Sequence, residues 1–231
     1  GNGICKLKEA GIAVDVGLLA GVGNVLNKRF FTSFVNSRPY VILKWAQTSD
    51  GFVARENFDS KWISNQYSRQ LVHKWRSEED AILVGKNTAK HDNPSLTTRE
   101  WEGKNPLRVV LDTSLELSSD LHLFDGKVKT FVLTRRKKAD TDNLKYLQVD
   151  AITPGTILAE LHKKRIQSII IEGGSQTLQS FIDANLWDEA RVFTAPATFE
   201  KGISAPAQNG KLIHEEDVLQ DHLQIYINQH G

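Results

Sequence analysis

Residues 167–193, which read QSIIIEGGSQTLQSFIDANLWDEARVF, constrain the fold more than any other part of the chain. Three consecutive isoleucines predict a short strand that is covered on both faces, and therefore a strand from the middle of a sheet. An acid and two glycines follow this strand directly, and a segment with the apolar spacing of a helix comes next. This order of strand, glycine turn and helix is typical of α/β folds.

Short apolar runs of the same kind recur along the chain and alternate with segments of helical spacing. We expect strands over residues 40–46, 81–85, 107–112, 130–134, 168–174, 189–196 and 222–228. We expect helices over residues 64–80, 154–165 and 175–186. Ser64 is a plausible N-cap for the first of these helices. The alternation predicts an α/β domain with a largely parallel central sheet and antiparallel strands at its C-terminal edge.

The N-terminal part of the chain has a different composition. Residues 1–31 predict a short helix, a strand over residues 12–17 and a second helix, which together lack the mass for a core of their own. A compositional break near residues 32–40 then leads into the first strand of the α/β domain.

Charge and cysteine content exclude several classes of function. The net charge is +1, which gives no support for a nucleic-acid or membrane partner, and no apolar run approaches the ~20 residues that span a bilayer. We therefore expect a soluble cytoplasmic protein. Cys5 is the only cysteine, so an intrachain disulfide and a zinc site built on cysteine pairs are impossible, and the seven histidines show no metal-ligand spacing.

The turn after the isoleucines is a candidate ligand site. In open α/β sheets, ligands bind outside the carboxyl ends of the central strands, which is where Glu172, Gly173 and Gly174 lie. Glycine lets a ligand approach main-chain N–H groups, and a helix starting near Ser175 would direct its positive end to the same place, which suits a phosphate. An ordinary tight turn with a solvated acid explains these residues about equally well.

Other polar clusters are open to two interpretations. Lys44 lies inside an apolar strand, where an outward-facing lysine is slightly favoured over one that serves a ligand. Arg76 is by default a solvated charge at a helix end. We expect residues 85–100 to form a loop. It combines several hydroxyls with Arg99, the groups that a phosphate monoester needs, although each residue alone fits an Asn-Pro turn with surface polarity.

Five motifs, taken together in their order along the chain, resemble a known family. They are RPYVILKWAQTSDG, SKWIS, WRSEEDAILVGKNTAKHDNPSLTTR, LRVVLDT and IEGGSQTL. The series closely resembles the reductase domain of the bifunctional riboflavin-biosynthesis deaminase/reductase, which has the dihydrofolate reductase-like fold. The resemblance implies a reductase domain over residues 38–231 and a C-terminal remnant of the deaminase domain over residues 1–37. The zinc-binding signature of the deaminase is absent, so we expect no deamination by this chain.

The resemblance also implies a reaction. An enzyme of this family uses NADPH to reduce 5-amino-6-(5-phosphoribosylamino)uracil, a phosphorylated pyrimidine-ribose compound, to its ribitylamino counterpart. The cofactor supplies the hydride, while the protein supplies position and electrostatics. The family usually forms dimers, so a homodimer is expected.

Site residues follow from matching the motifs position by position. Lys44 and Asp92 are the candidates for polarising the sugar and relaying a proton. The resemblance implies substrate binding by Ser60, Ser64, Arg76, Leu96, Arg99 and Glu172, with the two arginines on the phosphate. It implies NADPH binding by Ala46, Trp62, Thr88, Asp92, Thr113, Gly174, Ser175, Gln176, Thr177, Leu178, Gln179 and Ser180, and no metal. His91 stands where a small residue is usual, which narrows the expected site beside Asp92.

Two other functions remain compatible with these residues. One is a reductase of this fold that acts on another small heterocycle, such as a pterin or dihydrofolate-like ring, and so needs no phosphate grip. The other is a non-catalytic module that binds a nucleotide or dimerises.

Overall fold

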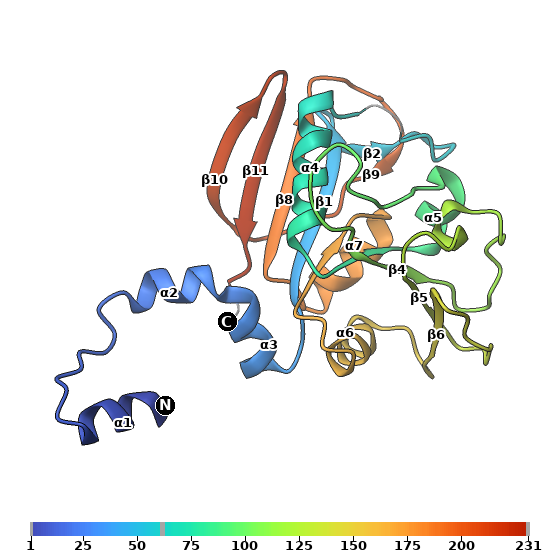
Figure 1. The fold of residues 1–231 in the computed structure, drawn as a ribbon. Coiled ribbons are helices and arrows are strands. Elements are labelled where there is room, and N and C mark those ends of the chain that lie inside the picture. The colour runs from blue at the N-terminus through green and yellow to red at the C-terminus, as the bar shows by residue number, and fades with distance from the viewer. Residues whose placement is uncertain (1, 61–62, 230–231) are drawn as a thin grey trace.

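The central strand of the fold is β7 (Ser168–Ile171), which carries the three isoleucines. It lies within a nine-stranded sheet in a computed structural model that describes residues 2–60 and 63–229 (Figure 1). The strand order is β10-β11-β8-β1-β7-β3-β4-β5-β6. The other strands of this sheet are β1 (Tyr40–Thr48), β3 (Ala81–Val84), β4 (Leu107–Leu111), β5 (Thr130–Thr134), β6 (Leu144–Gln148), β8 (Glu189–Ala195), β10 (Lys211–Val218) and β11 (Asp221–Ile227).

The pairing of these strands confirms the predicted sheet type. The strands from β8 to β6 in the spatial order are all parallel, whereas β11 pairs with β8, and β10 with β11, in the antiparallel sense. The C-terminal edge is thus antiparallel. A separate small ribbon joins β2 (Phe52–Ala54) to β9 (Ile203–Ser204).

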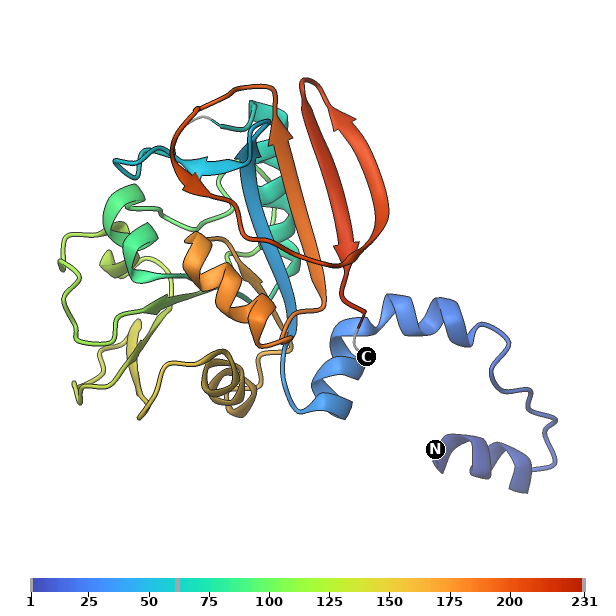
Figure 2. The same cartoon turned by 180° about the vertical axis from the view of Figure 1, so that it is seen from behind.

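Helices cover both faces of the sheet, which is why β7 is apolar throughout. The helix α4 (Gln66–Glu78) lies on the face seen in Figure 1, and α7 (Ser175–Asp183) lies on the opposite face, seen in Figure 2. The further helices of the domain are α5 (Lys86–Asp92), α6 (Pro154–Lys163) and the short 3-10 helix His122–Phe124.

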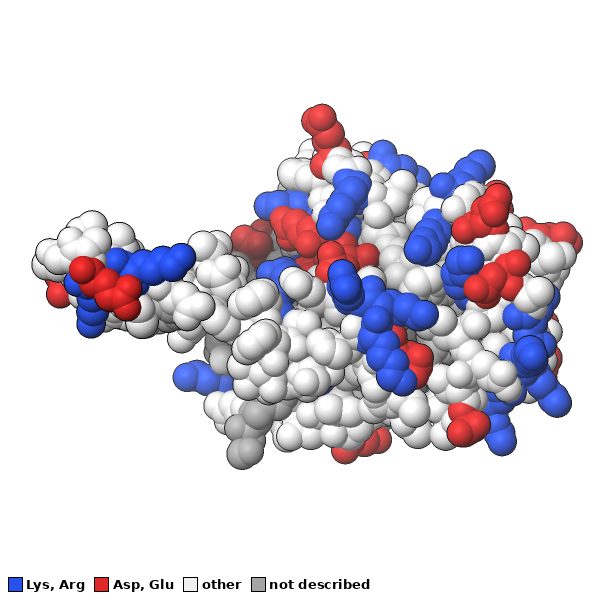
Figure 3. All heavy atoms as spheres, turned by 60° about the horizontal axis from the view of Figure 1, so that its bottom comes forward, with Lys and Arg blue, Asp and Glu red and all other residues white. Residues whose placement is uncertain are grey.

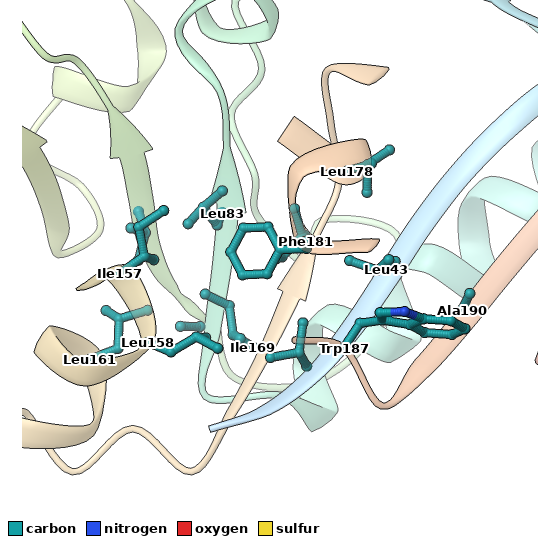
Figure 4. Packing of buried hydrophobic residues seen from close by; sticks show 14 of the residues in the cluster. Leu43, Leu83, Ile157, Leu158, Leu161, Ile169, Leu178, Phe181, Trp187 and Ala190 are labelled. Carbon is teal, nitrogen blue, oxygen red and sulfur yellow. The ribbon is translucent and has the colours of Figure 1, made fainter. Parts of the chain in front are cut away.

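The isoleucines of β7 divide between two cores because successive side chains of a strand point to opposite faces. Ile169 packs with α6, α7 and Trp187 in the cluster of Figure 4. Ile170 faces the other way and packs with α4 and α5, where Trp75 stacks on Phe193 with ring centroids 5.5 Å apart. All three isoleucines are fully buried, as the sequence predicted.

The start of α4 differs from the prediction by one residue. Asn65, not Ser64, is the N-cap, and its side-chain oxygen accepts hydrogen bonds from the backbone N–H groups of Tyr67 and Ser68 at 2.9 and 3.0 Å. Asn and Ser are both favourable N-caps, so only the path of the chain decides between them. The predicted start of α6 is confirmed, with Pro154 in the first turn.

Two local predictions were wrong, and the strands β2, β6, β9 and β10 were missed. Residues 12–17 are irregular rather than a strand, because no strand of residues 2–60 and 63–229 pairs with them. Residues 86–92 form helix α5 within what was expected to be a loop. Strand β10 was not predicted at all, because an edge strand with both faces exposed carries no hydrophobic alternation.

The N-terminal helices are α1 (Asn2–Glu9), α2 (Ala20–Leu26) and α3 (Lys28–Asn36). Helix α3 contacts β1, whereas α1 and α2 project from the body as an arm that Figure 3 also shows. Two ion pairs fasten α3: Lys28 pairs with Glu189, and Arg29 Nε donates to Glu79 Oε2 at 2.8 Å. Within the described ranges, none of the helices combines the length and apolarity needed to cross a membrane.

Candidate active site

A cavity of about 970 Å³ lies towards the carboxyl ends of β1, β3 and β7. Its volume is at the upper end of the range typical of small-molecule sites, so two ligands could lie side by side in it. The walls come from β1, residues 53–60, α4, residues 84–99 and the turn between β7 and α7. The position matches the expected site for an open α/β sheet.

Two glycine turns meet at the floor of this cavity. Gly85, after β3, donates its N–H to the carbonyl of Gly173, after β7, at 3.2 Å. A Cβ atom on Gly85 would lie 2.5 Å from Thr177 Oγ1, and a Cβ on Gly173 would lie 3.0 Å from Thr88 Cγ2. Gly174 has a φ of 53°, which side chains rarely tolerate. Glycine is therefore needed for α5 and α7 to begin so close together.

The start of α7 faces the cavity. Its N-cap is Gly174, and no side chain caps the first turn, whose residues line the cavity wall. The first N–H groups of a helix lack intrahelical partners and lie at the positive end of its dipole. This end of the cavity therefore fits an anionic group such as a phosphate.

Paired charges lie on the wall formed by α4, β1 and β7. Arg76 donates to both oxygens of Glu172, from Nε at 2.8 Å and from Nη2 at 2.6 Å, and its Nη1 donates to the Thr97 carbonyl at 3.1 Å. The side chains of Arg76 and Glu172 are only 11% and 7% exposed. The sequence favoured a solvated charge at a helix end for Arg76. Its position on α4 instead directs the side chain into the cavity wall.

Lys44 completes this group of charges from β1. Burial lowers the pKa of Lys44 most, Glu172 opposes that shift and Arg76 adds to it, so the pKa lies below the ordinary lysine value. Burial acts to raise the pKa of Glu172, but the charge and hydrogen bonds of Arg76, with Lys44, hold it below the ordinary value. The site therefore contains an ionised carboxylate and an ammonium group that gives up its proton more readily than a solvated lysine does.

Another part of the cavity wall is formed by residues 53–60 together with α5. Ser60 Oγ donates to Asp92 Oδ2 at 3.2 Å. Beside this contact, Phe58 stacks on His91 with ring centroids 4.3 Å apart and planes 8° from parallel. His91 thus lines the cavity together with Asp92.

Most of the predicted site residues lie in the lining of this one cavity. These are Lys44, Ala46, Ser60, Ser64, Arg76, Thr88, Asp92, Leu96, Arg99, Glu172, Gly174, Ser175, Gln176, Thr177 and Leu178. Trp62 lies outside the described residues.

Three predicted cofactor residues do not line the cavity. The Thr113 carbonyl accepts from the backbone of Arg135 at 3.0 Å, beyond the end of β4. Gln179 and Ser180 lie further along α7, where the helix turns them away: Gln179 accepts from the Ala207 N–H at 2.9 Å, and Ser180 donates to the Thr177 carbonyl at 2.7 Å.

Several lining residues were not predicted, among them Phe58, Arg69, His73 and Gly85. The spacing of Arg69, His73 and Arg76 at i, i+4 and i+7 was a usable signal, because such positions share one helix face. No local pattern marked Phe58, which reaches the site through the path of an irregular segment.

The parallel α/β fold, with a large cavity lined by glycine turns and paired charges, defines a class of enzymes that act on small molecules at the carboxyl edge of the sheet. The family model of the RibD C-terminal domain matches residues 39–212. The chain therefore belongs to the RibD C-terminal domain family, as its motifs suggested.

Individual relatives agree with this assignment. The chain is 38% identical over 211 residues to the riboflavin biosynthesis protein RibD of Aquifex aeolicus (strain VF5), an alignment that covers 88% of this chain and 59% of that protein. It superposes with a TM-score of 0.89 on the crystal structure of a diaminohydroxyphosphoribosylaminopyrimidine deaminase/5-amino-6-(5-phosphoribosylamino)uracil reductase from Thermotoga maritima. That match has 32% identity and covers 98% of this chain and 67% of the other.

A dihydrofolate reductase from Enterococcus faecalis shares the fold. The TM-score is 0.50 at 15% identity, over 82% of this chain and 97% of that one. The predicted dihydrofolate reductase-like fold class is thereby confirmed. The chain spans less than two thirds of the length of the first curated relatives that it matches.

Proposed function

We propose that this chain catalyses the NADPH-dependent reduction of 5-amino-6-(5-phosphoribosylamino)uracil to 5-amino-6-(5-phosphoribitylamino)uracil in riboflavin biosynthesis. The observation that carries the proposal is one cavity, in a RibD C-terminal domain, that joins a phosphate-compatible helix start to the group Lys44, Arg76 and Glu172. A nucleotide cofactor and a sugar phosphate together need this combination of positive backbone dipole and oriented charges.

The cofactor would occupy the side of the cavity formed by the two glycine turns. There Gly174 and the N–H groups at the start of α7 would hold its phosphates, and Thr88 and Thr177 would supply hydroxyls. When bound, reduced nicotinamide supplies a hydride to C1′ of the sugar. Thr113, Gln179 and Ser180 lie outside the cavity, so we do not assign them direct contacts with the cofactor.

The substrate would lie against the charged wall. Glu172, held by both of its oxygens on Arg76, would accept a hydrogen bond from a ribose hydroxyl or a uracil N–H. Breaking the bond between C1′ and the ring oxygen leaves an oxygen that needs a proton, and Lys44 Nζ would deliver it. Asp92, which lines the same cavity, would relay a proton from solvent that restores the ammonium form of Lys44.

The rest of the site would bind the phosphate. Arg99, Ser60 and Ser64 line the cavity with donors that suit a phosphate monoester. Arg76 is already committed to Glu172 and the Thr97 carbonyl, so its main role would be to orient Glu172.

We also propose that the chain combines parts of two domains. Residues 1–37 would be the end of a deaminase domain and residues 38–231 the reductase domain, with no deaminase activity in this chain because the zinc signature is absent. A homodimer fits the exposed edge strand β10, on which Leu212 and Ile213 are 40% and 52% exposed. Light scattering at several protein concentrations tests whether the chain forms this homodimer.

The decisive experiment follows the loss of reduced nicotinamide absorbance when the phosphorylated pyrimidine substrate is added, with NADH in parallel. We expect turnover with NADPH, and Arg99→Ala should raise KM for the substrate about tenfold or more, since a charge-assisted hydrogen bond is lost. Turnover of a dihydrofolate-like compound that Arg99→Ala leaves unchanged would instead favour a reductase of another heterocycle.

Cofactor binding can be tested separately by thermal unfolding. Saturating NADPH should stabilise the protein by ~2.7 kcal/mol at one hundred times its Kd. No shift in Tm at any concentration would count against an NADPH-dependent reductase and favour a non-catalytic module that dimerises without binding this nucleotide.

A further inference from the structure

His73 is a buried histidine in the wall of the cavity, one helical turn before Arg76 on α4. Its side chain is almost completely buried, with 3% of the residue exposed. The reaction proposed above does not use this residue, and His73 is not among the site residues that the sequence predicted.

One ring nitrogen of His73 lacks a hydrogen-bond partner in the part of the molecule that the structure describes. Among residues 2–60 and 63–229, Nδ1 is a buried nitrogen without a partner, and Nε2 lies 3.7 Å from Glu100 Oε1, too far for a hydrogen bond. A buried polar group without a partner destabilises a fold, so such a group calls for a ligand or a function.

The charges around His73 keep it neutral. Burial, then Arg76 on the same helix and Arg99 on the loop after α5, lower its pKa to about 4, while Glu100 and the Thr97 carbonyl act in the opposite direction. Glu172, which follows β7, also interacts with the ring. The imidazole is therefore neutral near pH 7, in a region where the nearby arginines favour an anion.

The two arginines differ in their availability. Arg76 is held on Glu172 and on the Thr97 carbonyl. Arg99 is exposed, lines the cavity and has no hydrogen bond or ion pair within the described part of the chain. An anion that binds at this wall would thus pair first with Arg99, and it would lie near the imidazole whose pKa Arg99 influences.

We propose that the phosphate of the substrate binds between Arg99 and His73, and that His73 takes up a proton from solvent as the phosphate arrives and donates a hydrogen bond to it. This inference rests on the proposed function, because it needs a phosphorylated substrate. A phosphate dianion offsets the field of the arginines at the ring, and protonation turns both ring nitrogens into donors. The unpaired histidine is thereby satisfied only in the complex.

The test uses the whole chain and D-ribose 5-phosphate as the probe, with unphosphorylated ribose as the matched ligand. Histidine-labelled protein is titrated between pH 3.5 and 8 by NMR, with and without saturating probe. We expect the midpoint of His73, near pH 4 in the free protein, to rise by about three pH units, to near 7, with ribose 5-phosphate and to stay constant with ribose.

Variants separate this role from a structural one. His73→Gln keeps a polar side chain but cannot titrate, so its affinity for ribose 5-phosphate near pH 6 should fall about tenfold and lose its dependence on pH. His222→Gln, at an exposed histidine on β11 that pairs with Asp217, should bind the probe like the wild type. If His73→Gln fails to fold, the wild-type titration still decides, because the low midpoint marks the His73 signal.

The comparison of the two ligands distinguishes a failure of this inference from a failure of the proposed function. If ribose 5-phosphate binds more tightly than ribose but leaves the His73 midpoint unchanged, the inference is overturned and the proposed function stands. If ribose 5-phosphate binds no better than ribose, the phosphate grip of the proposed function fails, and the inference fails with it.

Discussion

At the scale of single residues, the register between two strands decides the chemistry of Lys44. Leu43 on β1 pairs with Ile171 on β7 in a parallel register, so Lys44 and Glu172 follow at the next position of each strand. Arg76 approaches the same carboxylate from α4. The sequence favoured an outward lysine and a solvated arginine, because local alternation contains no information about which strand lies alongside.

The buried pair of Arg76 and Glu172 leads to a prediction about stability. Arg76→Ala leaves a carboxylate that is nearly buried without its main partner, so the free energy of unfolding should fall by roughly 3–5 kcal/mol. Urea denaturation measures the loss. Arg99→Ala is the matched control, because Arg99 lines the same cavity but is exposed. Its free energy of unfolding should stay within about 0.5 kcal/mol of the wild-type value. Equal midpoints for the two variants would show that the pair does not stabilise the fold.

At the scale of elements, the site depends on how closely α5 and α7 begin. The glycines after β3 and β7 were visible in the sequence as turn residues, but the contact between the two turns was not. Gly85 and Gly173 are 88 positions apart and meet because β3 and β7 are neighbours in the sheet. Their hydrogen bond is a consequence of strand order.

Gly85→Ala tests this close approach. The new Cβ would lie 2.5 Å from Thr177 Oγ1, so the unfolding free energy should fall by about 1–3 kcal/mol. The double variant Gly85→Ala/Thr177→Ala removes the clashing oxygen and should recover most of the loss. Gly155→Ala is the control, since its Cβ would meet no atom closer than 4.0 Å. A Gly85→Ala protein as stable as the control would contradict the tight contact between the turns.

At the scale of the whole molecule, the N-terminal segment divides into an attached part and a projecting part. Helix α3 supplies Lys28 and Arg29 to Glu189 and Glu79, and Glu79 is fully buried. Helices α1 and α2 project from the body, and α2 exposes apolar residues such as Val25, at 70%, and Leu26, at 79%. The ion pairs attach α3 to the α/β domain, although the amino-acid composition of the chain changes only after this helix.

Truncation distinguishes these two parts. A chain that starts at Lys28 should keep its Tm, whereas one that starts at Arg38 should lose roughly 3 kcal/mol or more, because the fully buried Glu79 loses Arg29. Glu189 loses Lys28 as well but keeps its ion pair with Arg191. Differential scanning calorimetry measures both. Arg29→Ala in the full-length chain should reproduce a large part of the loss. Equal Tm values for both truncations would show that α3 contributes nothing to the stability of the domain.

Much of the fold could be predicted from sequence, and the reason differs between elements. Strands buried on both faces, such as β3 and β7, have apolar runs that only a covered strand explains. Strand β10 has exposed residues along nearly its whole length, so its formation depends on pairing with β11 and leaves no hydrophobic pattern. Residues 12–17 show the reverse case, where strand-like residues remain irregular because no partner strand is present.

The sequence by itself determined the type of sheet, the buried strands, the glycine turn at the end of β7 and the family, because these depend on local periodicity and on motifs in a fixed order. Only the tertiary structure decided that Arg76 faces Glu172, that Nδ1 of His73 is buried without a partner among the described residues, and that Thr113 lies outside the cavity. The physical reason is that charge pairing and burial depend on distances between residues far apart in the chain. Those distances are set by strand order and register, which single segments do not encode.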